Sequence, residues 1–219
     1  MRVELLSYPS MNADKLCGWA AALCYDGKNI ERSLDIAMGG KHYSVAEHAN
    51  FTFLIEDVSR VLLAQLTRHR VASYSVQSQR YCGVKPVWVV PPSVKAEGYE
   101  DAFNLICDSA YRMMQEMMEH GVPAEDARYL IPQGVTCRLM VTMNIRELRH
   151  FFSLRCCTRA QWEIRELAWA MLKQCKRIAP KLFEQAGPSC MSGRCPEGSK
   201  SCGRVKEQNY ANLDTLEET

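Results

Sequence analysis

The stretch that decides the fold covers residues 49–81 and reads ANFTFLIEDVSRVLLAQLTRHRVASYSVQSQRY. Its beginning, 49–56, is rich in β-forming residues and predicts a strand. Three of its apolar side chains alternate onto one face, namely Phe51, Phe53 and Ile55. After a short turn, the apolar run over 60–67 predicts a buried helix. That helix would hold the remaining segment, 68–81, on a rigid support.

Segment 68–81 has a composition that no hydrophobic core requires. It contains three arginines, one histidine, three serines, two glutamines and two tyrosines within fourteen residues. Arginine offers two-pronged donors that suit phosphate and carboxylate groups. Serine hydroxyls and glutamine amides supply the donors and acceptors that recognise an oxo-heterocycle. The segment therefore indicates a binding site for a phosphorylated planar ligand.

The arginines of this segment are Arg68, Arg70 and Arg80, and they lack acidic neighbours along the chain. No acidic residue occurs between Asp57 and Glu97, so the three charges would repel one another unless an anion binds. Charge-assisted hydrogen bonds contribute about 1.5–3 kcal/mol each, and micromolar binding takes about 8 kcal/mol. The alternative is a solvated basic loop, or one paired with acids distant in sequence. Three other arginines each have an acid within three residues and by themselves predict surface ion pairs: Arg128, Arg146 and Arg165.

The rest of the chain is predicted to be mostly helical. Apolar positions at helical spacing predict helices over 12–25, 30–38, 99–120, 124–130, 145–154 and 159–179. In the first of these helices the recurring apolar residues are Leu16, Trp19, Ala20 and Leu23. In the helix over 99–120, the methionine-rich stripe favours a buried core face. Strands are predicted over 2–7 and 135–142, and prolines make 84–92 extended.

These elements predict an α+β fold. We expect a small, mainly antiparallel sheet that includes 49–56 and 135–142 and is packed by long helices. The helices over 99–120 and 159–179 would lie across the sheet or at subunit contacts. Residues 1–187 would form one domain, followed by an irregular tail over 188–219 that contains Cys, Gly and Ser.

Composition sets limits on the function. The chain has 219 residues, 47% hydrophobic and 24% charged, which is ordinary for a soluble globular protein. A net charge of +2 argues against a broad nucleic-acid footprint. We find no signal-like segment and no apolar run near the length of a membrane span, so we expect a cytoplasmic protein with no membrane partner. Its eleven cysteines would then be reduced thiols.

The order of residues in segment 68–81 resembles a known signature. Arg68-His69-Arg70, seven residues and then Ser78 resemble the R-H-R-x7-S motif of flavin-dependent thymidylate synthases. Ser73 and Arg80 fit the extended motif, whereas Ser75 and Val76 depart from its usual Asn and Glu. The resemblance covers about residues 40–185 in separated blocks, which include Gln65, His42…Ser44…Glu47-His48, Arg128, Asn144-x-Arg146, His150-Phe151-Phe152-Ser153-Leu154-Arg155 and Ala160-Gln161-Trp162-Glu163-Ile164-Arg165.

The resemblance implies an enzyme that methylates dUMP to dTMP, with 1–187 as its catalytic domain. Methylenetetrahydrofolate would be the carbon donor, FAD the redox cofactor and NADPH the reductant, and tetrahydrofolate would be released. The family is also homotetrameric, with active sites shared between subunits. The chain has no G-x-G-x-x-G sequence, so a Rossmann-type FAD site is not indicated.

The family pattern also implies site residues. Those expected to hold dUMP are Gln65, Arg68, Ser78, Gln79, Arg80, Arg128 and Arg155. Those expected to hold FAD are Ser44, Arg68, His69, Arg70, Asn144, Arg146 and His150. Arg155 and Ser78 are the expected catalytic residues: Arg155 would stabilise charge on the pyrimidine, and Ser78 would hydrogen-bond the nucleotide rather than act as a nucleophile. No metal is expected.

Two rival functions and one open question remain. A pyrimidine methylase could use a cysteine nucleophile, with Cys82, Cys137, Cys156 and Cys157 as candidates. A nucleic-acid-binding module could use the basic loop, with Tyr74 and Tyr81 as stacking platforms. The tail cysteines Cys190, Cys195 and Cys202 lack a C-x2-C pair and a nearby histidine, so they are solvated thiols, metal ligands or a redox pair.

Overall fold

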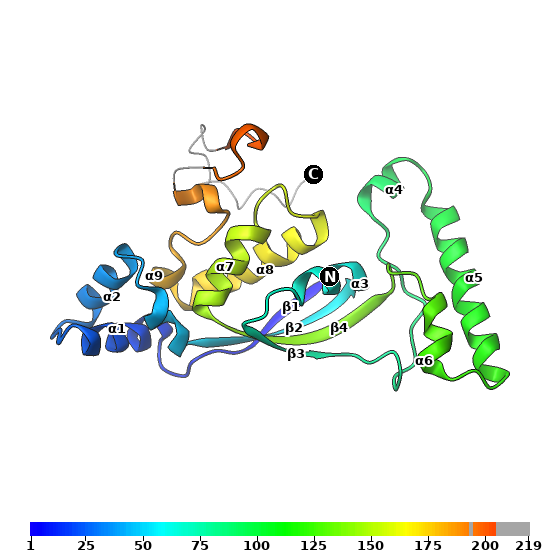
Figure 1. The fold of residues 1–219 in the computed structure, drawn as a ribbon, viewed down its shortest axis with the longest axis horizontal. Helices are drawn as coiled ribbons and strands as arrows, with labels where there is room; N and C mark the ends of the chain where they lie inside the picture. Colours follow the sequence, from blue (N-terminus) through cyan, green and yellow to red (C-terminus); the bar gives the residue numbers. More distant parts are fainter. Residues whose placement is uncertain (193–194, 205–219) are drawn as a thin grey trace. The chain divides into compact units, whose positions relative to one another are not determined.

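The structure is a computed structural model that describes residues 1–192 and 195–204 (Figure 1). It divides the chain into two compact units. The first unit contains residues 1–6 and 52–142, and the second contains residues 7–51 and the chain from Met143 onward. Part of the expected tail, 205–219, lies outside the described residues. No helix in the described part of the chain is both long and apolar enough to cross a membrane.

The sheet has four antiparallel strands in the order β1-β2-β4-β3 (Figure 1). The strands are β1 (Arg2–Ser7), β2 (Asn50–Ser59), β3 (Ala72–Val76) and β4 (Thr136–Asn144). The α+β class and the strands expected over 2–7, 49–56 and 135–142 are thus confirmed. Strand β3 was not expected, and it places part of segment 68–81 at a sheet edge instead of in a loop. A 2.9 Å contact between the Thr52 and Thr142 hydroxyls fixes the register of the two central strands.

Alternation along the central strands builds the core of the sheet. Val135, just before β4, and the inward side chains of β2 and β4 are at most 6% exposed; these strand residues are Phe51, Phe53, Ile55, Cys137, Leu139 and Val141. Strand β2 continues to Ser59, whose hydroxyl accepts a hydrogen bond from the Leu62 amide at 3.0 Å and caps α3 (Arg60–Leu66). Leu62 and Leu66 are fully buried. The predicted rigid support for segment 68–81 is therefore present.

The other helices of the first unit are α4 (Pro92–Ala96), α5 (Glu100–Glu119), α6 (Ala124–Ala127) and the short 3-10 helix η2 (Arg128–Leu130). Helix α5 packs against these three elements (Figure 1). Only Cys107 and Met114 are buried on α5, whereas Ile106 is 68% and Met113 is 50% exposed. The expected core face of this helix is therefore wrong for Ile106 and Met113, because its neighbours cover only one side.

The second unit is mainly helical. Its elements are α1 (Ala13–Cys24), α2 (Ile30–Gly39), the 3-10 helix η1 (Tyr43–His48), α7 (Ile145–Arg155), α8 (Trp162–Ile178) and α9 (Pro180–Phe183). Four phenylalanines form its aromatic core, with ring centroids of contacting pairs 5.6–5.9 Å apart: Phe51, Phe151, Phe152 and Phe183. Helix α8 begins later than predicted, because the Gln161 side chain caps it by accepting from the amides of Glu163 and Ile164.

Helix α1 buries a face of small residues. The buried residues are Ala13, Cys17, Gly18, Ala21 and Ala22. Two of the large residues that predicted the helix point outward, with Trp19 48% and Leu23 79% exposed. The reason is close approach to α2: a Cβ added at Gly18 would lie 2.5 Å from Ile30 Cγ2. The helix was predicted correctly, but not its buried face.

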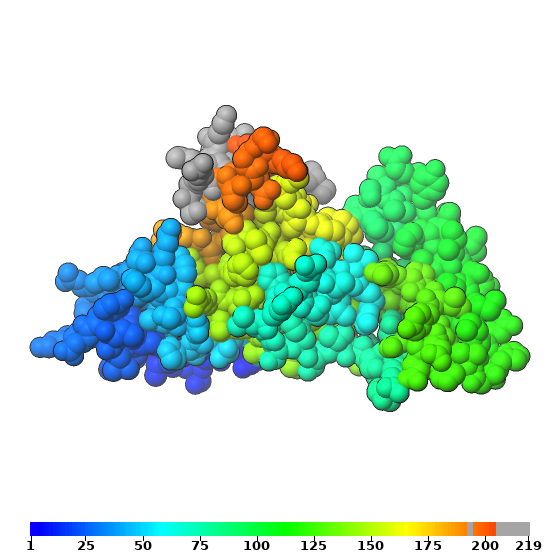
Figure 2. All heavy atoms as spheres, in the orientation of Figure 1, coloured from blue at the N-terminus to red at the C-terminus, as the bar shows by residue number. Residues whose placement is uncertain are grey.

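The described tail residues belong to the second unit. Residues 188–192 and 195–204, orange in Figure 2, contact the segment between α7 and α8, which is yellow. The only helical pieces described here are two short 3-10 turns, η3 (Ser189–Ser192) and η4 (Gly198–Lys200). The described part of the tail contains no longer helix and no strand.

Candidate functional site

Tyr74 holds the beginning of the arginine-rich segment in place. Its hydroxyl lies 2.8 Å from the Leu66 carbonyl and 2.9 Å from the His69 carbonyl, to which it donates. The His69 amide in turn donates to the Leu66 carbonyl at 3.1 Å. These bonds close the turn between α3 and β3. The turn that carries the R-H-R triplet is therefore held by the Tyr74 hydroxyl and by one backbone hydrogen bond from His69 to α3.

Within this triplet, the two arginines and the histidine have different surroundings. Arg68 and Arg70 are exposed, so both guanidinium groups are accessible to an anion. His69 is only 5% exposed and can offer a ligand no more than an edge of its ring. A pyrophosphate group needs cationic donors and a flavin needs polar edge contacts, so the two arginines fit an FAD site better than the histidine does.

The end of the segment is a tight turn. The Ser78 hydroxyl accepts a hydrogen bond from the Arg80 amide at 3.1 Å, and the Ser78 carbonyl accepts one from the Cys82 amide at 3.1 Å. The Gln77 amide donates to the Arg138 carbonyl at 3.0 Å and ties the turn to β4. Ser78, Gln79 and Arg80 are thus presented together from one ordered turn.

Arg80 and Arg128 meet at Glu125. The Arg80 Nε lies 2.5 Å from Glu125 Oε2, and the Arg128 Nε donates to the Glu125 carbonyl at 3.0 Å. The expectation that Arg80 has no acid nearby until an anion binds is therefore wrong, because Glu125 reaches it from α6. The predicted Arg128 ion pair with a nearby acid is replaced by a contact to backbone. Two of the arginines expected to hold dUMP therefore both contact Glu125.

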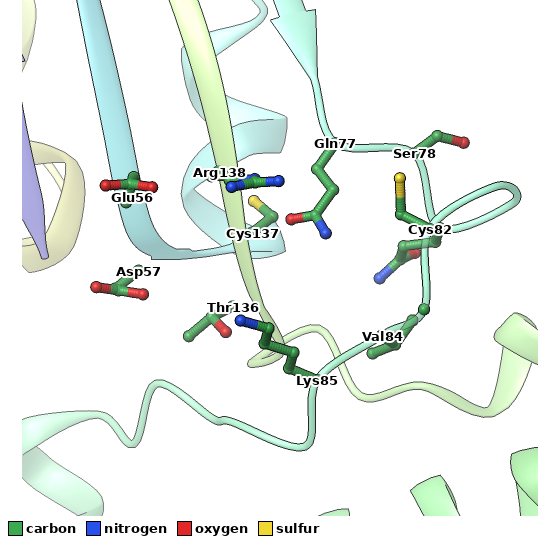
Figure 3. A pocket seen from close by; sticks show the side chains of 12 residues that line it. Glu56, Asp57, Gln77, Ser78, Cys82, Val84, Lys85, Thr136, Cys137 and Arg138 are labelled. Atoms are coloured by element: carbon green, nitrogen blue, oxygen red, sulfur yellow. The ribbon is translucent and has the colours of Figure 1, made fainter.

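Two cavities of the first unit flank the turn. The larger, about 430 Å³, lies between α3 and residues 131–135, and the smaller, about 150 Å³, lies beside β4. Gln79 lines both. Only the larger of these two falls in the usual size range for small-ligand sites. Figure 3 shows Gln77 and Arg138 pointing into the smaller cavity and the Ser78 hydroxyl pointing away from it.

Some polar residues near these cavities were not expected from the sequence. Arg138 and Lys85 line the smaller cavity together with Glu56 and Asp57. Arg60 lines the larger one. Nothing in the local spacing of these residues indicates a site. The expected Gln65 is half-buried on α3, where its amide donates to the Val61 carbonyl at 3.4 Å.

In the second unit, η1 and α7 present the remaining residues expected to hold FAD. The Asn144 side chain accepts from the Glu147 amide at 2.9 Å and caps α7. Arg146 pairs with Glu47 of η1 rather than with an acid next to it in sequence. The Arg149 guanidinium stacks over the Tyr43 ring at 4.9 Å and joins the two elements. The other two members of this set, Ser44 and His150, are exposed.

Arg155 is the last residue of α7 and is half-buried. It lines a cavity of about 250 Å³ that is also lined by Cys157, Cys190 and Cys195. The tail therefore lies beside the side chain that was expected to act on the pyrimidine. Sequence reasoning did not associate these cysteines with Arg155.

The cysteines do not favour a thiolate nucleophile. All eleven are free thiols. Burial raises the pKa of the Cys156 thiol well above its ordinary value, and Cys137 is only 6% exposed. A nucleophilic cysteine needs a lowered pKa and access to solvent, so two of the four candidates are unsuitable. Cys82 and Cys157 are more accessible.

Comparison with known proteins supports the resemblance seen in the sequence. A family model described as "Thymidylate synthase complementing protein" matches residues 4–181. A flavin-dependent thymidylate synthase of Geobacter sulfurreducens is 44% identical over 94% of this chain and 96% of that protein. Proteins of the same name from Saccharolobus solfataricus and Clostridium tetani are 48% and 40% identical, over 86% and 94% of this chain and 78% and 95% of their own lengths. The chain therefore belongs to the thymidylate synthase complementing protein family.

Proposed function

We propose that this chain reductively methylates dUMP to dTMP, with methylenetetrahydrofolate as carbon donor, FAD as cofactor and NADPH as reductant. The methylene group arrives at the oxidation level of formaldehyde, and two electrons from NADPH complete the methyl group. The folate therefore leaves as tetrahydrofolate. The observation that carries the proposal is the ordered R-H-R-x7-S segment within a chain that matches the family over 4–181.

The nucleotide would be held by the first unit's turn and its arginines. Ser78, Gln79 and Arg80 come from one tight turn, and Arg128 reaches Glu125 beside it. A phosphate dianion accepts forked hydrogen bonds from arginine. Gln65 and Arg68 on and after α3 would complete the set. The ordered turn lowers the entropic cost of binding, because these groups are already positioned.

When bound, FAD would carry the two electrons from NADPH to the nascent methyl group. In the first unit, Arg68 and Arg70 are accessible to its pyrophosphate, and His69 would act through a ring edge. In the second unit, Ser44 and His150 supply polar groups from two joined elements. Arg146 can bind the cofactor only by sharing or leaving its pair with Glu47. Asn144 uses its oxygen to cap α7, which leaves its amide nitrogen as the donor.

Arg155 would act on the pyrimidine ring of the substrate. A guanidinium beside the ring oxygens stabilises the negative charge that develops as C5 becomes nucleophilic. Arg155 is half-buried at the end of α7, and partial burial strengthens this interaction because water screens it less. Ser78 would hydrogen-bond the nucleotide. The Ser78 hydroxyl accepts a hydrogen bond from the Arg80 amide, and this partner is not a base that could activate the hydroxyl as a nucleophile.

We further propose that the protein acts as a homotetramer in the cytoplasm, with active sites shared between subunits. The exposed apolar side chains of α5 support an assembly, because large exposed apolar patches mark interaction sites. Residues 1–187 would be the catalytic domain.

The test is a flavin spectrum followed by a product assay. Purified protein incubated with FAD and desalted should remain yellow, and should convert dUMP to dTMP only with NADPH and methylenetetrahydrofolate together. Release of tetrahydrofolate supports the proposal. A colourless protein that methylates dUMP and releases dihydrofolate would favour the cysteine mechanism. Binding of DNA or RNA without binding of dUMP would favour the nucleic-acid module.

A further inference from the structure

Strand β2 is irregular beside the smaller cavity of the first unit. Alternation along a strand would turn the residue after Glu56 toward the core. Asp57 is instead exposed, has a left-handed φ of +57°, and is followed by the fully buried Val58. A β-bulge has this effect: it re-aims side chains, and bulges are over-represented next to active sites. Glu56 and Asp57 therefore both line the cavity, whose volume is about 150 Å³.

The register of the sheet places a cation opposite Glu56. The Thr52 and Thr142 hydroxyls face each other across β2 and β4, and this pairing continued along the two antiparallel strands sets Glu56 opposite Arg138. The Glu56 carboxylate, however, pairs with Arg2 of β1 at 3.2 Å. Arg138 and the second cation of the cavity, Lys85, form no ion pair with any residue that the structure describes. Both cations are therefore available to an anionic ligand.

This cavity lies beside the nucleotide turn and faces away from its serine. In Figure 3 the side chains of Gln77 and Arg138 point into the cavity, whereas the Ser78 hydroxyl points away from it. The Gln77 amide donates to the Arg138 carbonyl at 3.0 Å, which holds the two residues together. Gln79 lines the cavity as well. A ligand here would therefore adjoin a nucleotide on the Ser78 side of the turn without taking its place.

The groups around the cavity suit a ligand end that carries carboxylates and an N–H group. Arg138 and Lys85 can donate charge-assisted hydrogen bonds to carboxylates, and the Gln77 amide can add neutral ones. The Asp57 carboxylate can accept from an N–H group. A volume of about 150 Å³ is below the usual range for a whole small-molecule ligand. The cavity therefore fits one charged end of a longer molecule.

Methylenetetrahydrofolate has such an end. Its terminal glutamate carries two carboxylates and is joined through an amide N–H to the aminobenzoyl ring, which separates it from the transferred methylene group. We propose that the smaller cavity binds this glutamate, with Arg138 and Lys85 holding its carboxylates. The assignment rests on the proposed function. It places the methylene group toward the turn of Ser78 and Gln79, where the nucleotide is proposed to bind.

The test compares two carbon donors in wild type and variants. Methylenetetrahydropteroate lacks the glutamate, so its KM with wild type should be at least about tenfold above that of methylenetetrahydrofolate. Arg138→Ala and Lys85→Ala should each raise the KM for methylenetetrahydrofolate by about tenfold. They should leave the KM for methylenetetrahydropteroate, the KM for dUMP and the melting temperature nearly unchanged. Arg32→Ala, at an exposed arginine outside the cavity, should match wild type with both donors.

Calorimetric titration with tetrahydrofolate and with tetrahydropteroate makes the same comparison without turnover. The affinity for tetrahydrofolate should fall in Arg138→Ala, and the affinity for tetrahydropteroate should not. An equal loss with both compounds, or no loss in either variant, would overturn the assignment. So would a raised KM for NADPH alone, because the cavity would then hold the phosphate of that co-substrate.

Failure of this assignment can be told apart from failure of the proposed function. Normal turnover by wild type with equal KM values for the two carbon donors would contradict only the glutamate site. A wild-type protein that makes no dTMP from methylenetetrahydrofolate would contradict the proposed function, and the glutamate site with it.

Discussion

Arg80 is a side chain whose folding and binding roles can be separated by experiment. It pairs with Glu125, but both partners are about half exposed at 51% and 44%. Such a pair contributes at most about 1 kcal/mol to stability. A charge-assisted bond to phosphate contributes about 1.5–3 kcal/mol, which is about 10- to 150-fold in affinity. Arg80→Ala should therefore weaken dUMP binding by that factor, while the melting temperature and FAD binding change little.

Calorimetric titration with dUMP and a thermal melt would test this prediction. The matched control is Arg2→Ala, which removes an exposed arginine that pairs with Glu4 and Glu56. That variant should bind dUMP normally. Unchanged dUMP affinity in Arg80→Ala would remove Arg80 from the nucleotide site.

Tyr74 allows a second prediction, which concerns the position of the R-H-R triplet. Its hydroxyl contacts the carbonyls of Leu66 and His69, and Tyr74→Phe deletes only that group. The loss should lower the free energy of unfolding by about 1 kcal/mol. It should also weaken FAD binding several-fold, because the turn that positions Arg68 and Arg70 is no longer held by the Tyr74 hydroxyl. Fluorescence titration with FAD measures this effect. Tyr99→Phe, at a 64% exposed tyrosine, should show neither change.

The sequence predicted which of these residues belong to the site, but it did not predict their tertiary contacts or their burial. The motif gave the identity of Ser78 and Arg80 because residue types and spacing are local properties. It could not give the Glu125 partner of Arg80, which depends on how α6 packs. Nor could it give the burial of His69, because a triplet of polar residues carries no hydrophobic periodicity. The tail cysteines were visible, but the position of Cys190 and Cys195 in one cavity with Cys157 is a tertiary property.

At the scale of elements, the helix α1 shows why a predicted helix can have the wrong buried face. Large apolar residues set the sequence pattern, yet small residues permit the close approach of α2. A Cβ at Gly18 would lie 2.5 Å from Ile30 Cγ2 and 2.9 Å from the Ile30 carbonyl oxygen. Strand β3 escaped prediction for a related reason. It is a short edge strand with alternating polar residues and little apolar signal.

Gly18→Ala should therefore destabilise the protein, although alanine favours helix. Overpacking costs about 1–3 kcal/mol, whereas the gain in helix propensity is about 1 kcal/mol. Because the added Cβ meets backbone that cannot easily move, we expect the net change in stability to be unfavourable. Urea unfolding should show a lower midpoint. Gly39→Ala is the matched control, since nothing lies within 4 Å of its added Cβ. Equal midpoints for wild type and Gly18→Ala would mean that the two helices separate easily.

At the scale of the whole molecule, buried thiols should make stability depend on pH in the alkaline range. Burial raises the pKa of Cys17 from 9.0 to about 12, and it also raises the pKa values of Cys156 and Cys175. Below about pH 9 both folded and unfolded thiols are protonated, so this stability is fully present. Above it, only the unfolded thiols ionise, and stability is lost at up to about 1.4 kcal/mol per pH unit for each thiol.

Urea midpoints measured in reductant from about pH 8 to about pH 10.5 would show this loss. Cys17→Ala should reduce the loss of stability per pH unit by the contribution of one thiol. Cys24→Ala, at an exposed thiol, should leave the slope unchanged. A midpoint independent of pH over this range would contradict the burial of these thiols.

The apolar side of α5 provides the prediction about assembly. Ile106 and Met113 are 68% and 50% exposed, and residues seven apart share a helix face. If that face contacts another subunit, Ile106→Glu buries an unpaired charge and should dissociate the proposed tetramer and abolish dTMP formation. Gln115→Glu adds the same carboxylate on the opposite side, nine residues and about 900° of rotation away, and should stay assembled. Light scattering after gel filtration distinguishes the two variants.

Two outcomes would contradict this prediction. An Ile106→Glu variant that stays tetrameric would place the subunit contact elsewhere. A wild-type monomer with full activity would show that one chain forms the complete active site.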